Sequence, residues 1–211
     1  LSHGVMAAIG GYSVFYFAKT LGWNLSLSIV IGILLAGLIG YALDKLVYLP
    51  LRKRKASNMV LLVASLGLFT AIQAIIAILF TSQFQTLSQN ISGQRIYEIF
   101  GGVITQTQLT ILISALAITV GLVLLLKYTM FGKAIKAVSD DEEVAKIVGI
   151  NTNKIIGYVF FIGSAIAGLG GILVGFDTGI EPTMGFALLL KGVIAAIIGG
   201  VGSIYGALIG A

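Results

Sequence analysis

Long runs without a charged residue dominate this sequence and limit what it can fold into. Residues 25–43 form a stretch of nineteen residues that contains no Asp, Glu, Lys or Arg. A helix needs about 20 such residues to cross the hydrocarbon core of a bilayer. Only 10% of the chain is charged and its mean hydropathy is +1.06, whereas about a quarter of a soluble domain is charged. The sequence therefore predicts an all-α, polytopic membrane protein.

About six apolar segments are candidates for membrane helices. They are residues 4–18, 25–43, 59–80, 109–126, 155–176 and 186–211. We interpret residues 1–211 as a single transmembrane domain. Because the first segment is short and the last one ends within an apolar run, we expect the native protein to be longer at both ends. The segment 155–176 carries Gly163, Ala167, Gly171 and Gly175 at four-residue spacing, which predicts close packing against another helix.

The basic residues are concentrated in two polar loops. Ten of the 13 Lys and Arg residues lie in 44–58 and 127–154, which are separated by two apolar segments and so are expected on one side of the membrane. By the positive-inside rule that side is the cytoplasm, and the loops 81–108 and 177–185 are then external, with Leu1 on the cytoplasmic side. This orientation explains the net charge of +5 without nucleic-acid binding. Pro50 is expected to prevent a continuous helix through the first basic loop.

The second basic loop contains a short predicted helix, roughly residues 140–148. Ser139 fits the N-cap position of a capping box, with Glu142 reaching back from N3. Gly149 supplies the left-handed residue that ends such a helix. One face of the helix is apolar and consists of Val144, Ile147 and Val148. A face of this kind either docks on a partner protein or lies on the lipid headgroups.

The same loop resembles a known signature of membrane permeases. The run 143–149, E-V-A-K-I-V-G, is similar to the E-A-A-x-x-x-G motif of permease subunits in ATP-binding-cassette importers. The T-M-F-G-K-A run at 129–134, the Y-L-P-L-R run at 48–52 and the L-K-G run at 190–192 resemble more specifically the LivH-like branched-chain amino-acid permease family. The resemblance covers nearly the whole chain. It implies that coupling to an ATPase depends on Ser139, Glu142, Glu143, Ala145 and Gly149.

The resemblance implies a function and a set of partners. The expected protein is a transmembrane permease subunit of a prokaryotic importer for branched-chain or other hydrophobic amino acids, located in the cytoplasmic membrane. Its expected partners, besides the lipid bilayer, are two ATP-binding subunits, a second permease subunit in a homo- or heterodimer, and an external solute-binding protein. Three alternatives stay open at this stage: a permease for urea or short amides, a channel or carrier that works without ATP, and a membrane scaffold without a transport role.

The sequence lacks the residue patterns of enzymes and of cofactor-binding proteins. It has no Cys and a single His, His3, so thiolate chemistry is excluded and a metal site is not expected. It has no G-x-x-x-x-G-K-[ST] loop, so any ATP is expected to be bound by a partner chain. The carboxylates show no acid and base pairing that catalysis is needed to explain. We therefore expect a chain without enzymatic activity and without a cofactor of its own.

Lys191 is a charge placed inside an apolar stretch. Because an ionisable group in the membrane costs roughly 3 kcal/mol on insertion scales, it is a candidate for the translocation path. Asp177 and Glu181 are near enough in sequence to be its counter-ions. The alternative is that Lys191 extends its amine to the headgroups.

A glycine cluster in the last apolar segment is the second candidate for the path. It consists of Gly199, Gly200 and Gly202. These glycines either break a membrane helix, so that the freed backbone groups face a pathway, or form a ridge for helix packing.

Overall fold

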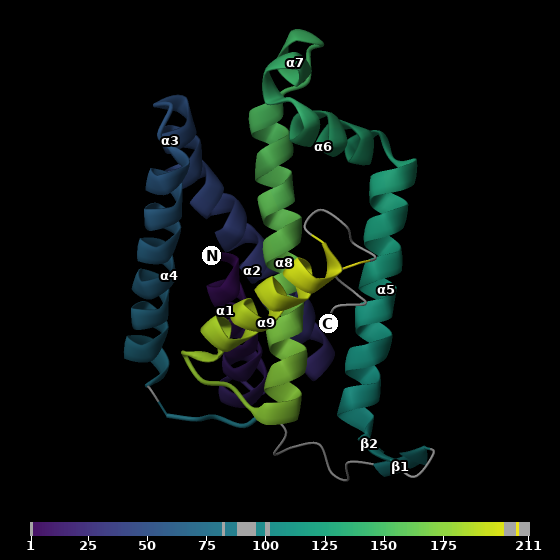
Figure 1. Ribbon diagram of the computed structural model, residues 1–211. Coiled ribbons are helices and arrows are strands. Elements are labelled where there is room, and N and C mark those ends of the chain that lie inside the picture. The colour runs from purple at the N-terminus through teal and green to yellow at the C-terminus, as the bar shows by residue number, and fades with distance from the viewer. Residues whose placement is uncertain (1, 82, 88–95, 100–101, 201–205, 207–211) are drawn as a thin grey trace.

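The computed structural model describes residues 2–81, 83–87, 96–99, 102–200 and 206, and these residues are mainly helical (Figure 1). Four helices of this described part are long and apolar enough to cross a membrane, namely residues 25–53, 58–80, 106–128 and 152–178. Shorter apolar helices lie beside them. The prediction of an all-α, polytopic membrane protein is confirmed.

The helices and strands follow one another along the chain in a simple order. They are α1 (Ser2–Val14), the π-helical turn η1 (Phe15–Thr20), α2 (Leu25–Leu43), the π-helical turn η2 (Asp44–Tyr48), α3 (Leu49–Lys53), α4 (Asn58–Phe80), β1 (Ile96–Ile99), β2 (Gly102–Thr105), α5 (Gln106–Tyr128), α6 (Met130–Asp140), α7 (Glu142–Ile147), α8 (Thr152–Thr178) and α9 (Met184–Gly199). The two strands pair antiparallel as a small hairpin, with Ile96 opposite Thr105. The hairpin lies inside the loop 81–108 and leads directly into α5.

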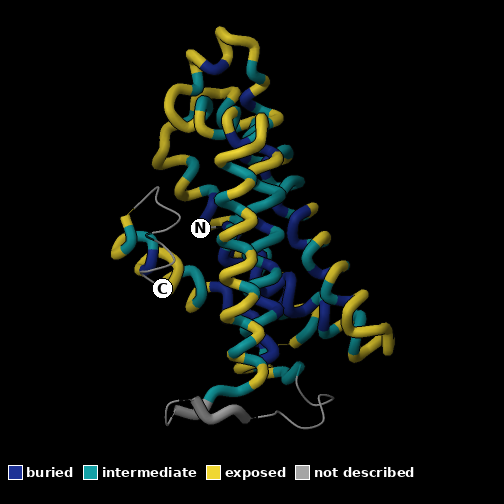
Figure 2. Tube along the Cα trace, turned by 90° about the vertical axis from the view of Figure 1, so that its right-hand side faces the viewer, coloured by how far each residue is buried: buried dark blue, intermediate teal, exposed yellow. Residues whose placement is uncertain are grey.

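The core of the bundle is formed by α1, α2 and α8. Every residue of α1 except His3 and Ser13 is buried (Figure 2). Close approach is possible because small residues meet at the crossings: Gly10 lies against the backbone of Gly168, and Gly171 lies against the backbone of Ala7. In a membrane such packing contacts, and not water exclusion, hold helices together. Gly171, one of the small residues spaced four apart in α8, therefore makes the close helix contact that was predicted for it.

The helix that begins with α2 does not stop at the first basic loop. It continues through η2 and α3, so that residues 25–53 form one helical unit of 29 residues. Pro50 lies in the first turn of α3. In the π-helical turn before it, the N–H of Leu49 donates to the carbonyl of Asp44, five residues back. This wider turn accommodates the proline ring, which would clash with a carbonyl in a regular α-helix. The expectation that Pro50 prevents a continuous helix was wrong for this reason.

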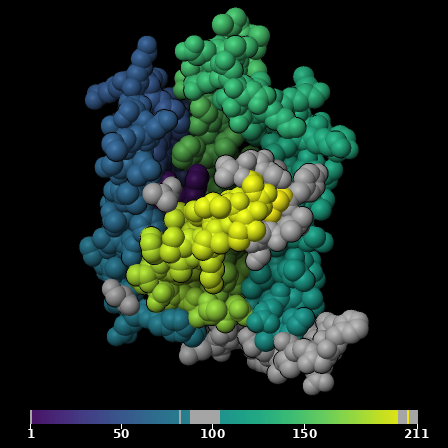
Figure 3. Space-filling view, in the orientation of Figure 1, coloured from purple at the N-terminus to yellow at the C-terminus, as the bar shows by residue number. Residues whose placement is uncertain are grey.

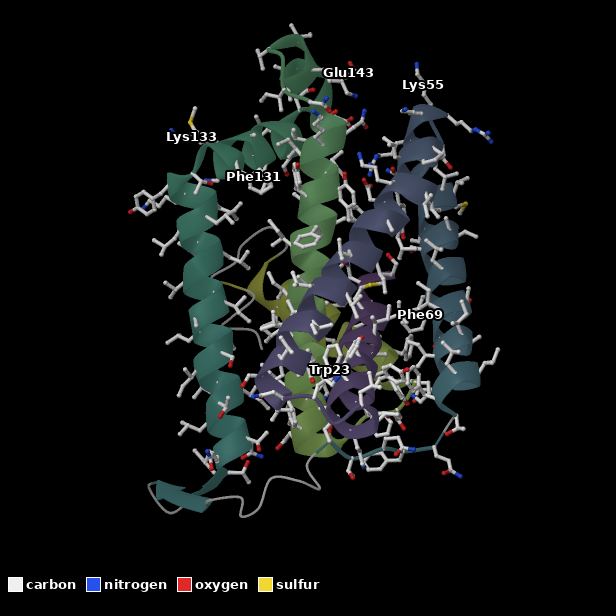
Figure 4. The ribbon with its side chains drawn as sticks, turned by 180° about the vertical axis from the view of Figure 1, so that it is seen from behind. Trp23, Lys55, Phe69, Phe131, Lys133 and Glu143 are labelled. Carbon is white, nitrogen blue, oxygen red and sulfur yellow. The ribbon has the colours of Figure 1, made fainter. Side chains whose placement is uncertain are left out.

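The two basic segments lie at the same end of the bundle, which we call the basic end. Figure 4 places Lys55, Lys133 and Glu143 at this end, and Trp23 toward the opposite one. The connection between α8 and α9 lies away from the basic end, and it is shorter than the predicted loop 177–185 because α8 extends to Thr178. It is also partly inserted into the protein, since Ile180 is buried and exchanges two backbone hydrogen bonds of 2.9 and 2.8 Å with Gln85. Which end faces the cytoplasm stays a prediction, and Leu1 lies outside the described residues.

Candidate functional site

The segment between α5 and α8 forms two helices instead of one. In Figure 1, α6 lies across the basic end between α5 and α8, and α7 projects beyond it. Ser139 lies in the last turn of α6, so it is not the N-cap of α7. That position is taken by Asp141, whose Oδ1 accepts hydrogen bonds from the backbone N–H groups of Glu143, at 2.8 Å, and Val144, at 3.0 Å. An ionised carboxylate makes stronger hydrogen bonds to backbone N–H groups than a hydroxyl does, so the helix begins at Glu142.

We expect Asp141→Ala to loosen α7 specifically. Removing an N-cap side chain typically costs about 1 kcal/mol of helix stability. Amide hydrogen exchange of residues 142–147 should therefore become roughly five-fold faster, while exchange in α8 stays unchanged. Asp140→Ala is the matched control, because Asp140 is the exposed last residue of α6 and caps no helix. Equal exchange rates in the two variants would show that the cap does not determine where α7 begins.

The end of α7 agrees with the prediction for Gly149. This glycine has φ +87°, in the left-handed region. Its N–H donates to the carbonyl of Lys146 at 3.1 Å, and the N–H of Ile150 donates to the carbonyl of Ala145 at 3.0 Å. These two bonds are the Schellman pattern that ends a helix. A side chain at position 149 would be strained in this conformation.

Glu142 connects α7 to the start of α8 through a hydrogen bond with Thr152, instead of reaching back to Ser139 as predicted. Its Oε1 accepts a 2.7 Å hydrogen bond from Lys146 Nζ and a 3.3 Å hydrogen bond from Thr152 Oγ1. The Lys146 ammonium holds the pKa of the Glu142 carboxyl below its ordinary value of 4.5. Because the pKa is lowered, the pair stabilises α7 above about pH 4.5 and loses this contribution as the pH falls through the lowered pKa. Both side chains are well exposed, so the contribution is a few tenths of a kcal/mol.

The outer face of α7 is apolar and uncovered. Ala145 is 2% exposed and seats the helix on the protein. On the other side, the exposed fractions of Val144, Ile147 and Val148 are 53, 83 and 67%. We call these three side chains the α7 face. Glu143 is exposed beside them and has no hydrogen-bond partner for its carboxylate within the described residues. A helix that exposes such a face in water has a surface for a partner to cover.

Aromatic side chains connect α6 to the membrane helices. The ring of Phe131, at the start of α6, meets Tyr158 of α8 edge-on at 6.0 Å between centroids. Tyr158 in turn stacks on Tyr41 of α2 at 6.4 Å, and the Lys45 ammonium lies over the Tyr41 ring at 5.4 Å. Figure 4 shows Phe131 on α6, at the basic end. Phe131 therefore contacts α8 directly and is linked to α2 only through Tyr158.

A buried ion pair lies where α2 passes into α3, and sequence reasoning did not identify it. Arg52 Nη2 donates to Asp44 Oδ1 at 2.7 Å. The Asp44 side chain is fully buried and that of Arg52 is 20% exposed. The Arg52 charge also lowers the pKa of Glu142, so this pair lies within electrostatic range of α7. The sequence pattern that could have identified this ion pair is an acid, Asp44, that directly follows an uncharged run and has an arginine, Arg52, two helical turns later.

A cavity of about 400 Å³, largely open to the surface of the protein, lies between α1, α8 and α9. Its lining includes Gly4 and Ala7 of α1, Gly170 and Val174 of α8, and Leu189 and Val193 of α9. In Figure 3 a recess is visible beside the yellow α9, with N-terminal residues in purple at its floor. Among the described residues that line the cavity, only His3 has a polar side chain. Its Nδ1 lies 3.0 Å from Ser164 Oγ on α8, and its ring lies 5.0 Å from that of Phe160.

The residues proposed for the translocation path occupy different places. Lys191 is exposed on α9 and does not line the cavity. Among the described residues neither Asp177 nor Glu181 forms an ion pair with Lys191, so the nearness of these acids in sequence does not make them its counter-ions here. Gly199 is the last residue of α9 and Gly200 has φ +87°, so the helix does break at these glycines. Gly202 lies outside the described residues. That any of them lines a path stays a prediction.

Comparisons with known proteins agree with this architecture. The whole chain, residues 1–211, matches the model of a family described as "Branched-chain amino acid transport system / permease component". Over 221 residues the chain is 31% identical to the high-affinity branched-chain amino acid transport system permease protein LivH of Escherichia coli K12, covering 99% of this chain and 71% of LivH. It is 29% identical to BraD, a permease protein of the same description from Pseudomonas aeruginosa, covering 99% of this chain and 71% of BraD. A more distant relative, 26% identical and covering 100% of this chain and 59% of the relative, is the fructose import permease protein FrcC of Rhizobium meliloti. No solved structure matches the chain significantly.

Proposed function

Since the chain belongs to the permease-component family of branched-chain amino acid transport systems, we propose that it is the membrane subunit through which an ATP-driven importer passes branched-chain or other hydrophobic amino acids. The observation that carries the coupling part of this proposal is the α7 face, an apolar surface exposed at the basic end of the bundle. The family membership supports the substrate class, since LivH and BraD are named for branched-chain amino acids.

The proposed mechanism uses α7 as the contact with a separate ATPase. The α7 face would be buried in a groove of the ATPase, and Ala145 would keep α7 fixed on the permease. When two ATPase subunits close on ATP, they would carry α6 and α7 with them. Phe131, through Tyr158 and Tyr41, would pass this movement to α8 and α2. The membrane helices would then alternate between inward-open and outward-open arrangements.

The remaining partners follow from the same proposal. The importer would contain a second permease subunit, and an external solute-binding protein would deliver the amino acid. The protein is a multi-pass membrane protein, and we infer that its membrane is the cytoplasmic membrane of a prokaryote, with the basic end in the cytoplasm. The ATP would be bound by the ATPase subunits and not by this chain.

We expect Ile147→Asp to disconnect the ATPase while leaving the permease folded. Ile147 is 83% exposed, so the change costs little in the isolated subunit, but it places a charge in the proposed interface. Affinity for the ATPase should fall at least tenfold, or about 1.4 kcal/mol. The measurement is co-purification of the ATPase in mild detergent, followed by ATP hydrolysis stimulated by leucine-loaded binding protein.

Met59→Asp is the matched control for this experiment. Met59 is an apolar residue of similar exposure, 77%, but it lies at the start of α4 and outside the α7 face. The control should retain the ATPase and its stimulation. If neither variant weakens the association, the α7 face is not the contact. If the native protein associates with no ATPase and still transports amino acids, an ATP-independent carrier replaces the importer.

A further inference from the structure

We propose that the cavity between α1, α8 and α9 is a binding site in the permease for the aliphatic side chain of the transported solute. The proposal rests on the function proposed above and adds to it a place in this chain where solutes are distinguished by size. The site does not involve Lys191 or the helix break at Gly199 and Gly200.

The size of the cavity fits a small solute. Its volume of about 400 Å³ is at the lower end of the range of about 300–1,000 Å³ that is typical of ligand sites. Its walls are provided by three helices, two of which, α1 and α8, are fixed against each other in the core. The third helix, α9, packs mainly against α1 and only slightly against α8. A movement of α9 relative to α8 would let the site hold a solute and then release it.

The chemistry of the lining selects an aliphatic group. The walls contain glycine, alanine, valine and leucine, and each Å² of apolar solute surface removed from water contributes about 25 cal/mol. A sugar placed here would bury hydroxyl groups without partners, at a cost of about 1–3 kcal/mol each. Among the described lining residues His3 has the only polar side chain, so the charged end of an amino acid would have to lie beside His3 or outside the cavity. The cavity therefore fits a branched aliphatic side chain better than a carbohydrate.

The glycines around the cavity differ in whether a side chain could be added at their positions. A Cβ atom at Gly168 or Gly171 would overlap atoms of α2 or α1, so these positions serve helix packing. A Cβ atom at Gly170 or at Gly192 of α9 would meet no atom within 4 Å, and both of these residues line the cavity. Side chains added at these two positions would therefore fill the cavity without disturbing the core.

The test is to shrink the cavity with Gly170→Val and Gly192→Val in the intact transporter. We expect the ratio of leucine uptake to valine uptake to fall at least tenfold, because one methylene in a hydrophobic pocket changes discrimination by about 10–200-fold. ATPase co-purification should stay unchanged. Gly67→Val in α4 and Gly121→Val in α5 are matched controls, since they too meet no atom within 4 Å but lie away from the cavity. Their uptake ratio should equal that of the native protein.

Three results would overturn the inference. If uptake of both amino acids is unchanged, the cavity does not lie on the route of the solute. If both fall equally, and the second permease no longer co-purifies, the cavity is covered by a helix of that subunit. If the native transporter takes up neither leucine nor valine, the proposed function fails, and this inference fails with it. Native uptake is therefore measured first, which separates the two failures.

Discussion

Replacing Gly10 with valine should destabilise the core of the bundle. A Cβ atom at this position would overlap the carbonyl group of Gly168, because α1 and α8 cross with their backbones in contact. Overpacking a core usually costs about 1–3 kcal/mol, and the cost is highest when the opposing atoms are backbone that cannot rotate away. Because the net free energy of unfolding of a protein is itself small, a loss of this size should clearly reduce the amount of folded protein that is recovered from the membrane. The measurement is the amount of monodisperse protein after detergent extraction, and its midpoint of thermal unfolding.

Gly67→Val is the control for this prediction. It adds the same side chain to a membrane helix, but at a position of α4 where a Cβ atom meets nothing within 4 Å. Its yield and unfolding midpoint should be close to those of the native protein. A Gly10→Val variant that unfolds at the native temperature would show that α1 and α8 do not cross at this point.

The membrane helices were predictable because the signal for them is local and strong. Runs without charge, each next to one of the two basic loops, located α2, α4, α5 and α8, and the spacing of small residues in α8 indicated which of its faces is packed. The error at Pro50 has a different origin. A proline in an apparent loop argues against a helix, but the π-helical turn η2 just before Pro50 removes the clash, and no residue pattern indicates such a turn.

The candidate site was predictable only where its geometry is set by neighbouring residues. Gly149 ends α7 as expected, since a left-handed turn after a helix is a property of a few consecutive residues. The N-cap was wrongly assigned to Ser139 because two competent caps lie two positions apart, and the choice of Asp141 follows from how far α6 extends. The cavity could not be found at all, because its walls combine residues 3–7 of α1 with residues 167–174 of α8 and 188–196 of α9, and α1 is more than a hundred residues away from the other two helices in the chain.

Arg52→Ala should be the most damaging change at the basic end. It would leave the fully buried Asp44 carboxylate without its partner, and breaking a buried ion pair in this way costs about 3–5 kcal/mol. Asp44→Asn should cost clearly less, because the remaining Arg52 side chain is 20% exposed and can turn toward water. The double variant Asp44→Asn with Arg52→Ala removes both charges and should recover most of the stability lost in Arg52→Ala. Thermal unfolding of the four proteins in one detergent measures this cycle. If the double variant is no more stable than Arg52→Ala, arginine acts at this position through its packing and not by neutralising the buried acid.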